Sequence, residues 1–175
     1  HGLSKATVRE PVASYFYTQQ HDVPRSWHAV QRLRGLMAAA LGYDMPKSAA
    51  DFSIRLSDPE SAEVCFHQPY VVFVHATTWS TKYWPVKSWQ GLMEQVTQQG
   101  YRVLLPWGTQ KEREQACLLA KDNDAAEVLP KMGLSAVARL LQRARAVVSV
   151  DTGLGHLSAA LGVPTVSLYG PTDPA

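Results

Sequence analysis

From residue 70 onward, short runs of apolar and β-branched residues alternate with segments whose apolar side chains recur at helical spacing. The runs predict strands at 70–75, 101–106, 126–129, 146–150 and 164–169. The intervening segments predict helices at 88–99, 109–122, 135–144 and 154–161. Apolar strands separated by helices are typical of a parallel sheet that helices cover on both faces. The sequence therefore predicts an α/β fold for this part of the chain.

The residues before the first of these strands show no such alternation. Apolar residues within 7–17 predict a short helix, and those within 30–41 recur at spacings of three and four, which predicts an amphipathic helix. Gly42 is a signal that ends the second helix. Residues 44–60 hold two prolines and scattered charges, with a brief extended stretch predicted at 52–54. We expect helices and a connector to precede the sheet.

Composition excludes several classes of function. The chain has 17 Lys and Arg against 15 Asp and Glu, and this net charge of +2 is too weak for non-specific nucleic-acid binding. Cys65 and Cys117 lack the spacing of a zinc site and predict no disulfide framework, which fits a reducing, cytoplasmic setting. No apolar run approaches the roughly twenty residues of a membrane span. The chain starts at His1 without a signal peptide and ends at Ala175 in a predicted loop, so we expect both ends to be cut.

The strongest local signal follows the strand predicted at 146–150. Asp151, Thr152 and Gly153 lie where that strand passes into a helix, and His156 follows one turn later. Thr152 is suited to capping the helix, and Gly153 lets the backbone approach a ligand, so that free N–H groups point at a negative oxygen. The alternative is a helix cap followed by an ordinary helical histidine. The sequence Asp-Thr-Gly also occurs in aspartic proteases, but the β-rich lobes of those enzymes have no counterpart in this sequence.

A second signal follows the strand predicted at 70–75. Thr77 and Thr78 offer hydroxyls and backbone amides, and Lys82 offers a positive charge, which together are typical of a diphosphate cradle. The GxxxxGK[ST] run of P-loop NTPases is absent. The alternative for Lys82 is an exposed loop lysine.

Two further residues lie in loops that a parallel sheet brings to the same edge. Glu112 opens a predicted helix, where the helix dipole favours a carboxylate and where it is also suited to bind a ribose or sugar hydroxyl. Met132 is suited to lie against an adenine face, although methionine more often fills gaps in a core. For Trp84 and Trp89 we prefer structural packing.

Motifs in a single order along the chain carry a resemblance to a known family. They are HATTxxxKxWP at 75–85, LPWG followed by a Glu at 105–112, VLPKM at 128–132, SVDTGLGHL at 149–157 and YGPTDP at 169–174. Together they resemble the ADP-heptose:lipopolysaccharide heptosyltransferases of glycosyltransferase family 9. Two earlier stretches are similar to the same family, so the resemblance covers nearly all 175 residues. It is closest to the members that add the first heptose to a Kdo residue.

The resemblance implies a GT-B fold, in which two Rossmann-like domains face a cleft. Residues 1–66 are then expected to be the end of the N-terminal, acceptor-binding domain and the connector between the domains. Residues 67–175 are expected to form the nucleotide-sugar-binding domain, a Rossmann-like parallel sheet with helices on both faces, truncated at its C-terminus.

The resemblance also implies an activity. It is the inverting transfer of L-glycero-D-manno-heptose from ADP-heptose to a Kdo residue of Kdo2-lipid A, in the synthesis of the lipopolysaccharide inner core. No metal and no cofactor are expected to take part. Because the acceptor is lipid-linked, we expect peripheral association with the cytoplasmic face of the bacterial inner membrane.

The family's donor-binding positions match residues of this chain. The resemblance gives Thr77, Thr78, Lys82 and the amides of Thr152 and Gly153 to the diphosphate, Glu112 and Met132 to the nucleoside, and Asp151 and His156 to the donor near its diphosphate and sugar. The general base of the family is an Asp in a glycine-containing loop near the N-terminus of the full protein, and these residues hold no counterpart. We therefore expect the 175 residues alone to be inactive.

Other functions remain open at this point. One alternative is heptosyltransferase II or another GT-B transferase with a different donor. An alternative from another class is a non-catalytic nucleotide-binding module.

Overall fold

The computed structural model describes residues 1–54, 56 and 68–170. The chain divides into two compact units, His1–Asp51 and Phe52–Pro174. The boundary predicted between residues 66 and 67 lies outside the described residues, as do Cys65 and the last four residues of the YGPTDP motif.

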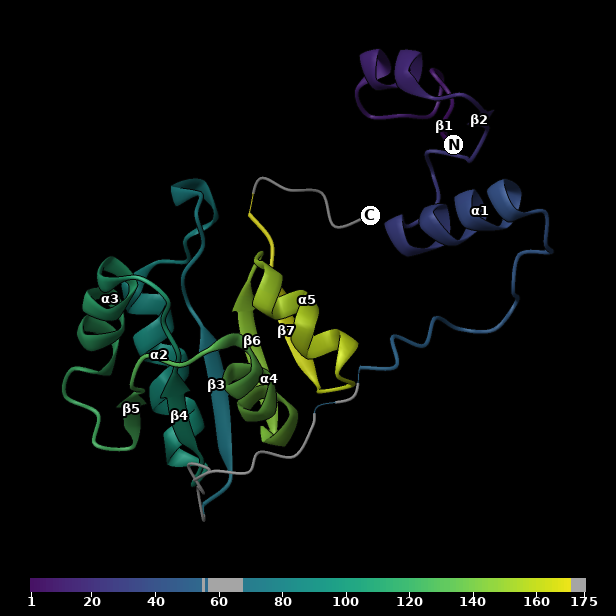
Figure 1. The fold of residues 1–175 in the computed structure, drawn as a ribbon. Helices are drawn as coiled ribbons and strands as arrows, with labels where there is room; N and C mark the ends of the chain where they lie inside the picture. Colours follow the sequence, from purple (N-terminus) through teal and green to yellow (C-terminus); the bar gives the residue numbers. More distant parts are fainter. Residues whose placement is uncertain (55, 57–67, 171–175) are drawn as a thin grey trace. The chain divides into compact units, whose positions relative to one another are not determined.

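The first unit contains two short strands, a 3-10 helix and an α-helix (Figure 1). They are β1 (Gly2–Leu3), η1 (Pro11–Phe16), β2 (Gln20–His21) and α1 (Ala29–Leu41). The two strands pair in parallel, with Gly2 opposite Gln20 and Leu3 opposite His21. Strands of two residues are too short to show a periodic pattern, which is why the sequence did not predict them.

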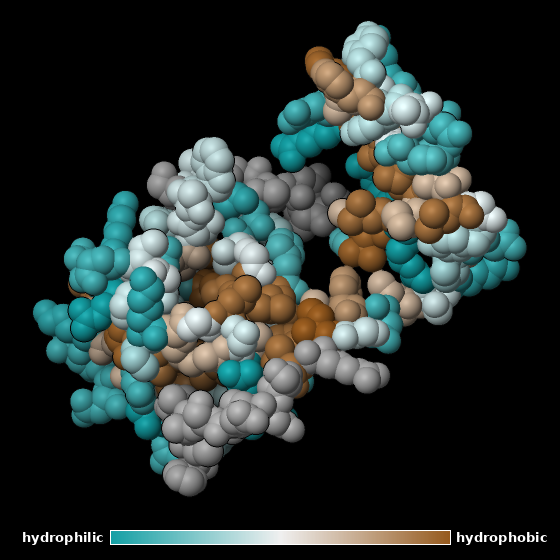
Figure 2. All heavy atoms as spheres, viewed as in Figure 1, coloured by the Kyte–Doolittle hydropathy of each residue, from teal (hydrophilic) through white to brown (hydrophobic). Residues whose placement is uncertain are grey.

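The amphipathic helix predicted at 30–41 is confirmed as α1. It ends where Gly42 adopts a left-handed conformation with φ of 73°, which glycine tolerates without steric cost. Its apolar stripe of Leu33, Met37 and Leu41 is 51–66% exposed. Figure 2 shows hydrophobic residues on the surface of this unit.

Two predictions for the residues before 55 need correction. The helix predicted at 7–17 begins only at Pro11, because two amides before it bond back to Ser4 in a turn and the proline ring suits the first helical position. The stretch at 52–54 is not extended, because Ser53 has a φ of 47°, in the left-handed region.

The second unit is built on a five-stranded, entirely parallel sheet in the order β5-β4-β3-β6-β7 (Figure 1). Its strands are β3 (Tyr70–Val74), β4 (Arg102–Leu105), β5 (Ala126–Val128), β6 (Ala146–Val150) and β7 (Thr165–Leu168). Its helices are the 3-10 helix η2 (Ser80–Lys82), α2 (Val86–Gln98), α3 (Gln110–Ala120), α4 (Leu134–Arg143) and α5 (Gly153–Ala160). The predicted α/β fold is confirmed, with each predicted element present.

Helices cover both faces of this sheet, and the alternation of side chains along β3 assigns each face its own core. Val71 and Phe73 pack with residues of α2 and α3 on one face. Tyr70, Val72 and Val74 pack with residues of α4 on the other face, where α5 adds partly buried side chains. A strand that is buried on both faces has no polar side, which explains the continuous apolar run in the sequence.

The order of the strands changes direction between β3 and β6. The chain runs outward from β3 through β4 to β5, and then returns to place β6 and β7 on the opposite side of β3. Where the order of a parallel sheet reverses in this way, the connections after the two central strands leave in opposite directions and open a crevice at the carboxyl ends of the strands. Beyond Val74 and Val150 the fold therefore has the position at which sheets of this kind commonly bind ligands.

Candidate functional site

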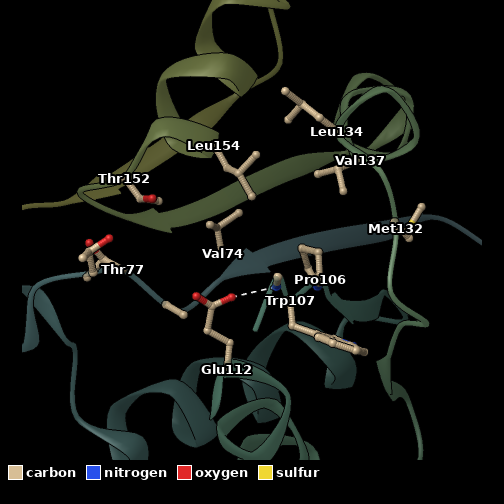
Figure 3. Close-up of a pocket in the computed structure, with 13 residues that line it drawn as sticks. Val74, Thr77, Pro106, Trp107, Glu112, Met132, Leu134, Val137, Thr152 and Leu154 are labelled. Carbon is tan, nitrogen blue, oxygen red and sulfur yellow. Dashed lines mark hydrogen bonds between the residues drawn. The ribbon is translucent and has the colours of Figure 1, made fainter. Parts of the chain in front are cut away.

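A cavity of about 300 Å³ lies at this edge of the sheet (Figure 3). Its walls come from the segments that follow β3 and β4 and from the first turns of α4 and α5. This volume is at the small end of the range for pockets that hold small organic ligands. Five of the predicted site residues line it, namely Thr77, Thr78, Glu112, Met132 and Thr152.

The remaining walls of the cavity are largely apolar and were not predicted. Val74 lies near the centre of the lining residues, while Leu134 and Val137 of α4 and Leu154 of α5 lie on the opposite side of the cavity from Glu112 (Figure 3). Trp107 lies beside Glu112, and its indole N–H donates to the carbonyl of Leu129 at 2.5 Å. Apolar residues in the first turn of a helix give no sequence signal that separates a ligand wall from a core.

Three of the other predicted residues, Lys82, Asp151 and His156, form a cluster of ionisable side chains centred on Asp151. Lys82 Nζ lies 2.5 Å from Asp151 Oδ2, and the two side chains are 23% and 11% exposed. Thr77 Oγ1 donates to the carbonyl oxygen of Asp151 at 3.3 Å. His156 Nε2 lies 3.8 Å from the other carboxylate oxygen of Asp151. Lys82 is therefore a paired, partly buried group, and the alternative interpretation as an exposed loop lysine is wrong.

Thr152 occupies the N-cap position of α5, as predicted, but its hydroxyl makes no capping hydrogen bond. The hydroxyl instead lies at the edge of the cavity (Figure 3). Gly153 is the first residue of α5, so its amide and that of Leu154 have no carbonyl within the helix to bind. The start of α5 thus offers backbone donors and the positive end of a helix dipole beside the Asp151 cluster.

Glu112 is fixed in place by a capping box at the start of α3. Its amide binds Thr109 Oγ1 at 3.3 Å, and its Oε2 accepts hydrogen bonds from the amides of Gly108 at 2.7 Å and Thr109 at 3.2 Å. Among the described residues, none donates to the other carboxylate oxygen, Oε1. Glu112 therefore both caps the helix and presents an acceptor to the cavity (Figure 3).

Met132 combines the two roles that the sequence left open, because it packs against the core of α4 and α5 and also lines the cavity. For Trp84 and Trp89, structural packing is confirmed. Trp89 is fully buried, with Trp84 edge-on to it at a centroid distance of 5.1 Å.

His75 is a residue of this region that the sequence did not assign to the site. Its side chain is fully buried just after β3, and its Nε2 donates to the carbonyl oxygen of Glu112 at 3.1 Å. Burial lowers the pKa of His75, while the backbone carbonyls of Glu112 and Phe73 and the Glu112 carboxylate act in the opposite direction.

The lowered pKa of His75 predicts acid destabilisation of the second unit. Below the ordinary His pKa of 6.5, the unfolded state takes up a proton that the buried ring resists, so the free energy of unfolding falls as the pH drops through 6.5 toward the lowered native value. Above 6.5 this contribution is fully present. Urea titrations between about pH 5 and 8 on the wild type and His75→Gln measure it. If the free energy of unfolding changed with pH by the same amount in both proteins, the prediction would be contradicted.

Two glycines of the SVDTGLGHL motif are expected to respond differently to substitution. A Cβ on Gly155 would lie 2.7 Å from Ser149 Oγ, whereas a Cβ on Gly153 would meet no heavy atom within 4 Å. We expect Gly155→Ala to lower the free energy of unfolding by about 1–3 kcal/mol, because α5 must move off β6. Gly153→Ala serves as the matched control and should leave it nearly unchanged. Equal losses in denaturant titrations of the two variants would contradict this packing argument.

Within residues 1–54, 56 and 68–170, no group of three or more His, Cys, Asp and Glu side chains is arranged to hold a metal ion. No helix in this part of the chain has the length and apolar character to cross a membrane.

Comparison with known proteins gives consistent matches. Residues 1–175 match the family described as Glycosyltransferase family 9 (heptosyltransferase). The chain is 48% identical to lipopolysaccharide heptosyltransferase 1 of Pseudomonas aeruginosa and 47% identical to that of Salmonella typhimurium, over 99% of its own length and 48% and 55% of theirs. Lipopolysaccharide heptosyltransferase 2 of S. typhimurium is 29% identical over 81% of this chain and 43% of that protein. The chain thus spans about half the length of the curated relatives it matches.

Solved structures give the same picture. The E. coli heptosyltransferase WaaC with ADP superposes with a TM-score of 0.88 at 45% identity, covering 99% of this chain and 55% of that one. The same enzyme with ADP-2-deoxy-2-fluoro heptose gives a TM-score of 0.84 over 100% of this chain and 55% of that one. The E. coli ADP-heptose lps heptosyltransferase II gives 0.56 at 29% identity, over 61% of this chain and 34% of that one.

Proposed function

This chain belongs to glycosyltransferase family 9, and from that premise we propose that its parent protein transfers L-glycero-D-manno-heptose from ADP-heptose to a Kdo residue of Kdo2-lipid A. The observation that carries the proposal is the cavity at the reversal of the strand order, with a lysine, a threonine and a helix N-terminus beside it. These features match the parts of a nucleoside diphosphate. The solved relative with ADP supports this choice of ligand.

The nucleoside of the donor fits the cavity itself. Met132, Leu134 and Leu154 offer apolar surface for an adenine ring, and Glu112 Oε1 offers an acceptor for a ribose hydroxyl. The diphosphate then lies toward Thr77, Thr78, Lys82 and the first amides of α5. In this arrangement His156, which is largely exposed, lies on the sugar side of the site.

The same groups suit the departure of ADP. When the bond from the anomeric carbon to the diphosphate breaks, ADP gains about one unit of negative charge. Lys82 and the amides at the start of α5 are held in place before the reaction, so they stabilise that charge without reorganising. A divalent metal or a cofactor is not needed in this scheme. Asp151 neutralises part of the charge of Lys82 and fixes the position of its ammonium group.

The acceptor hydroxyl must lose its proton to a base. By resemblance to the family, that base is an Asp of the N-terminal domain, and we assign it to no residue of this chain. The acceptor is lipid-linked, so we place the protein at the cytoplasmic face of the inner membrane as a peripheral protein. The identities of 45–48% to the first heptosyltransferases, against 28–29% to the second ones of S. typhimurium and E. coli, favour the first transfer.

The test is a transfer assay on the full-length protein. We expect heptose transfer from ADP-heptose to Kdo2-lipid A, with no transfer from UDP-sugars and none onto an acceptor that already carries the first heptose. We expect the isolated 175-residue polypeptide to give no turnover. Transfer only onto the heptosylated acceptor would identify a second heptosyltransferase. ADP binding without any transfer by the full-length protein would instead support a non-catalytic nucleotide-binding module.

A further inference from the structure

His75 stands out among the polar residues near the cavity because it does not reach it. Its side chain is fully buried, while Thr77 and Thr78 of the same segment line the cavity. Its Nε2 lies 3.1 Å from the carbonyl oxygen of Glu112. A carbonyl oxygen only accepts hydrogen bonds, so the neutral ring carries its proton on Nε2 and donates.

Glu112, the partner of His75, is also hydrogen-bonded through its backbone amide and through one oxygen of its carboxylate. The amide of Glu112 binds Thr109, and its carboxylate accepts the amides of Gly108 and Thr109. These hydrogen bonds hold the loop after β4 and the first turn of α3 together as one segment. All of them join residues within four positions of one another. The hydrogen bond from His75 is different because it joins this segment to the end of β3, 37 positions earlier in the chain.

We propose that His75 is a positioning residue, which holds the first turn of α3 against β3 and so sets where the Glu112 carboxylate lies in the cavity. The choice of ADP as its ligand rests on the proposed function. His75 does not line the cavity and is not proposed to contact ADP. Any effect of His75 on ADP is therefore exerted through Glu112. Without the bond, a buried donor or acceptor is left unpaired and the first turn of α3 loses its link to the sheet.

Two substitutions and a control separate positioning from packing. His75→Phe keeps a ring of similar size but removes the donor. His75→Gln places an amide N–H near the position of Nε2 and should restore the bond. Tyr70→Phe is the matched control, because Tyr70 lies at the other end of β3 and its buried hydroxyl donates to the carbonyl of Leu140 at 2.9 Å, away from Glu112. If His75→Phe does not fold, His75→Asn replaces it, since its shorter amide does not reach the carbonyl.

The first measurement needs no ligand. Hydrogen exchange of the Gly108 and Thr109 amides, measured on the full-length protein, reports whether the Glu112 carboxylate still holds them. We expect exchange at these amides to quicken about tenfold in His75→Phe and to stay near the wild-type rate in His75→Gln and Tyr70→Phe. Unchanged exchange in His75→Phe would overturn the proposal, as would equally fast exchange in Tyr70→Phe.

The second measurement compares two ligands by calorimetry. Pyrophosphate does not reach Glu112, whereas ADP does in the proposed arrangement. We expect His75→Phe to weaken ADP binding about tenfold while leaving pyrophosphate binding unchanged, and His75→Gln to restore ADP binding. Equal losses for both ligands would show general loosening and overturn the positioning role. If the wild type binds no ADP, the proposed function fails, and the exchange of the two amides still decides the role of His75.

Discussion

The Lys82→Ala variant of the full-length protein is expected to lose about 100- to 1,000-fold in kcat for heptose transfer, the usual effect of removing one group that stabilises charge in a transition state. Lys82 is partly buried and already held at 2.5 Å from Asp151, so it meets the departing diphosphate without first being ordered. Asp151 is the one partner of the Lys82 ammonium group among the described residues, so two of its three hydrogens remain for phosphate oxygens. The loss should fall on kcat because the charge on ADP develops during bond breaking.

Removing Lys82 also changes its partner. Asp151 is only 11% exposed, and without Lys82 its carboxylate loses the ammonium group that lies 2.5 Å from it. We therefore expect ADP binding to weaken as well, and Lys82→Arg to retain more activity than Lys82→Ala because it keeps the charge.

The control is Lys87→Ala, which removes an exposed lysine on α2 five positions later. Steady-state kinetics with ADP-heptose and calorimetry with ADP, run in parallel on the variants, provide the measurement. If Lys82→Ala and Lys87→Ala have the same kinetics as the wild type, Lys82 has no role in the reaction.

The strands and helices of the parallel sheet were predictable because the sequence patterns that indicate them are local. The strands of the second unit are short segments rich in apolar and β-branched residues. Gly100 and Gly162, with φ of 85° and 76°, lie where the sequence predicted that helices end. Each such signal depends on neighbours within a few positions. The order of the strands is set by packing between distant segments, and a two-residue strand such as β1 leaves no pattern to detect.

The candidate site likewise contains features that the sequence predicts locally and features that depend on distant segments. Hydroxyl, amide and charged residues after the strands were predicted to meet, because the carboxyl ends of parallel strands share one edge. The pairing of Lys82 with Asp151 joins residues 69 positions apart and has no local signature. The apolar wall from Leu134 and the link from His75 to Glu112 were missed for the same reason, since a buried histidine after a strand looks the same in sequence whatever it binds.

Trp89→Ala is expected to lower the free energy of unfolding by about 3–5 kcal/mol, the range for truncating a large buried aromatic residue. Trp89 is fully buried in the core between α2 and the sheet, with the Phe73 ring at a centroid distance of 5.0 Å and the Trp84 ring edge-on at 5.1 Å. Its truncation leaves a cavity that these rings fill only by leaving their own contacts. A domain is stable by only about 5–15 kcal/mol, so this loss is a large fraction of the total.

The loss should reach the site through Trp84. This residue follows η2, which carries Lys82, and its ring depends on Trp89 for the edge-on contact. We expect Trp89→Ala to lower the affinity for ADP even at temperatures where the protein remains folded. Trp89→Phe should cost less, because it keeps a ring and removes an indole N–H that has no hydrogen-bond partner among the described residues. The control is Leu118→Ala on α3, where the side chain is 50% exposed. Denaturant titrations would refute the argument if Trp89→Ala and Leu118→Ala unfolded at the same midpoint, because the Trp89 ring would then contribute no more than a surface leucine.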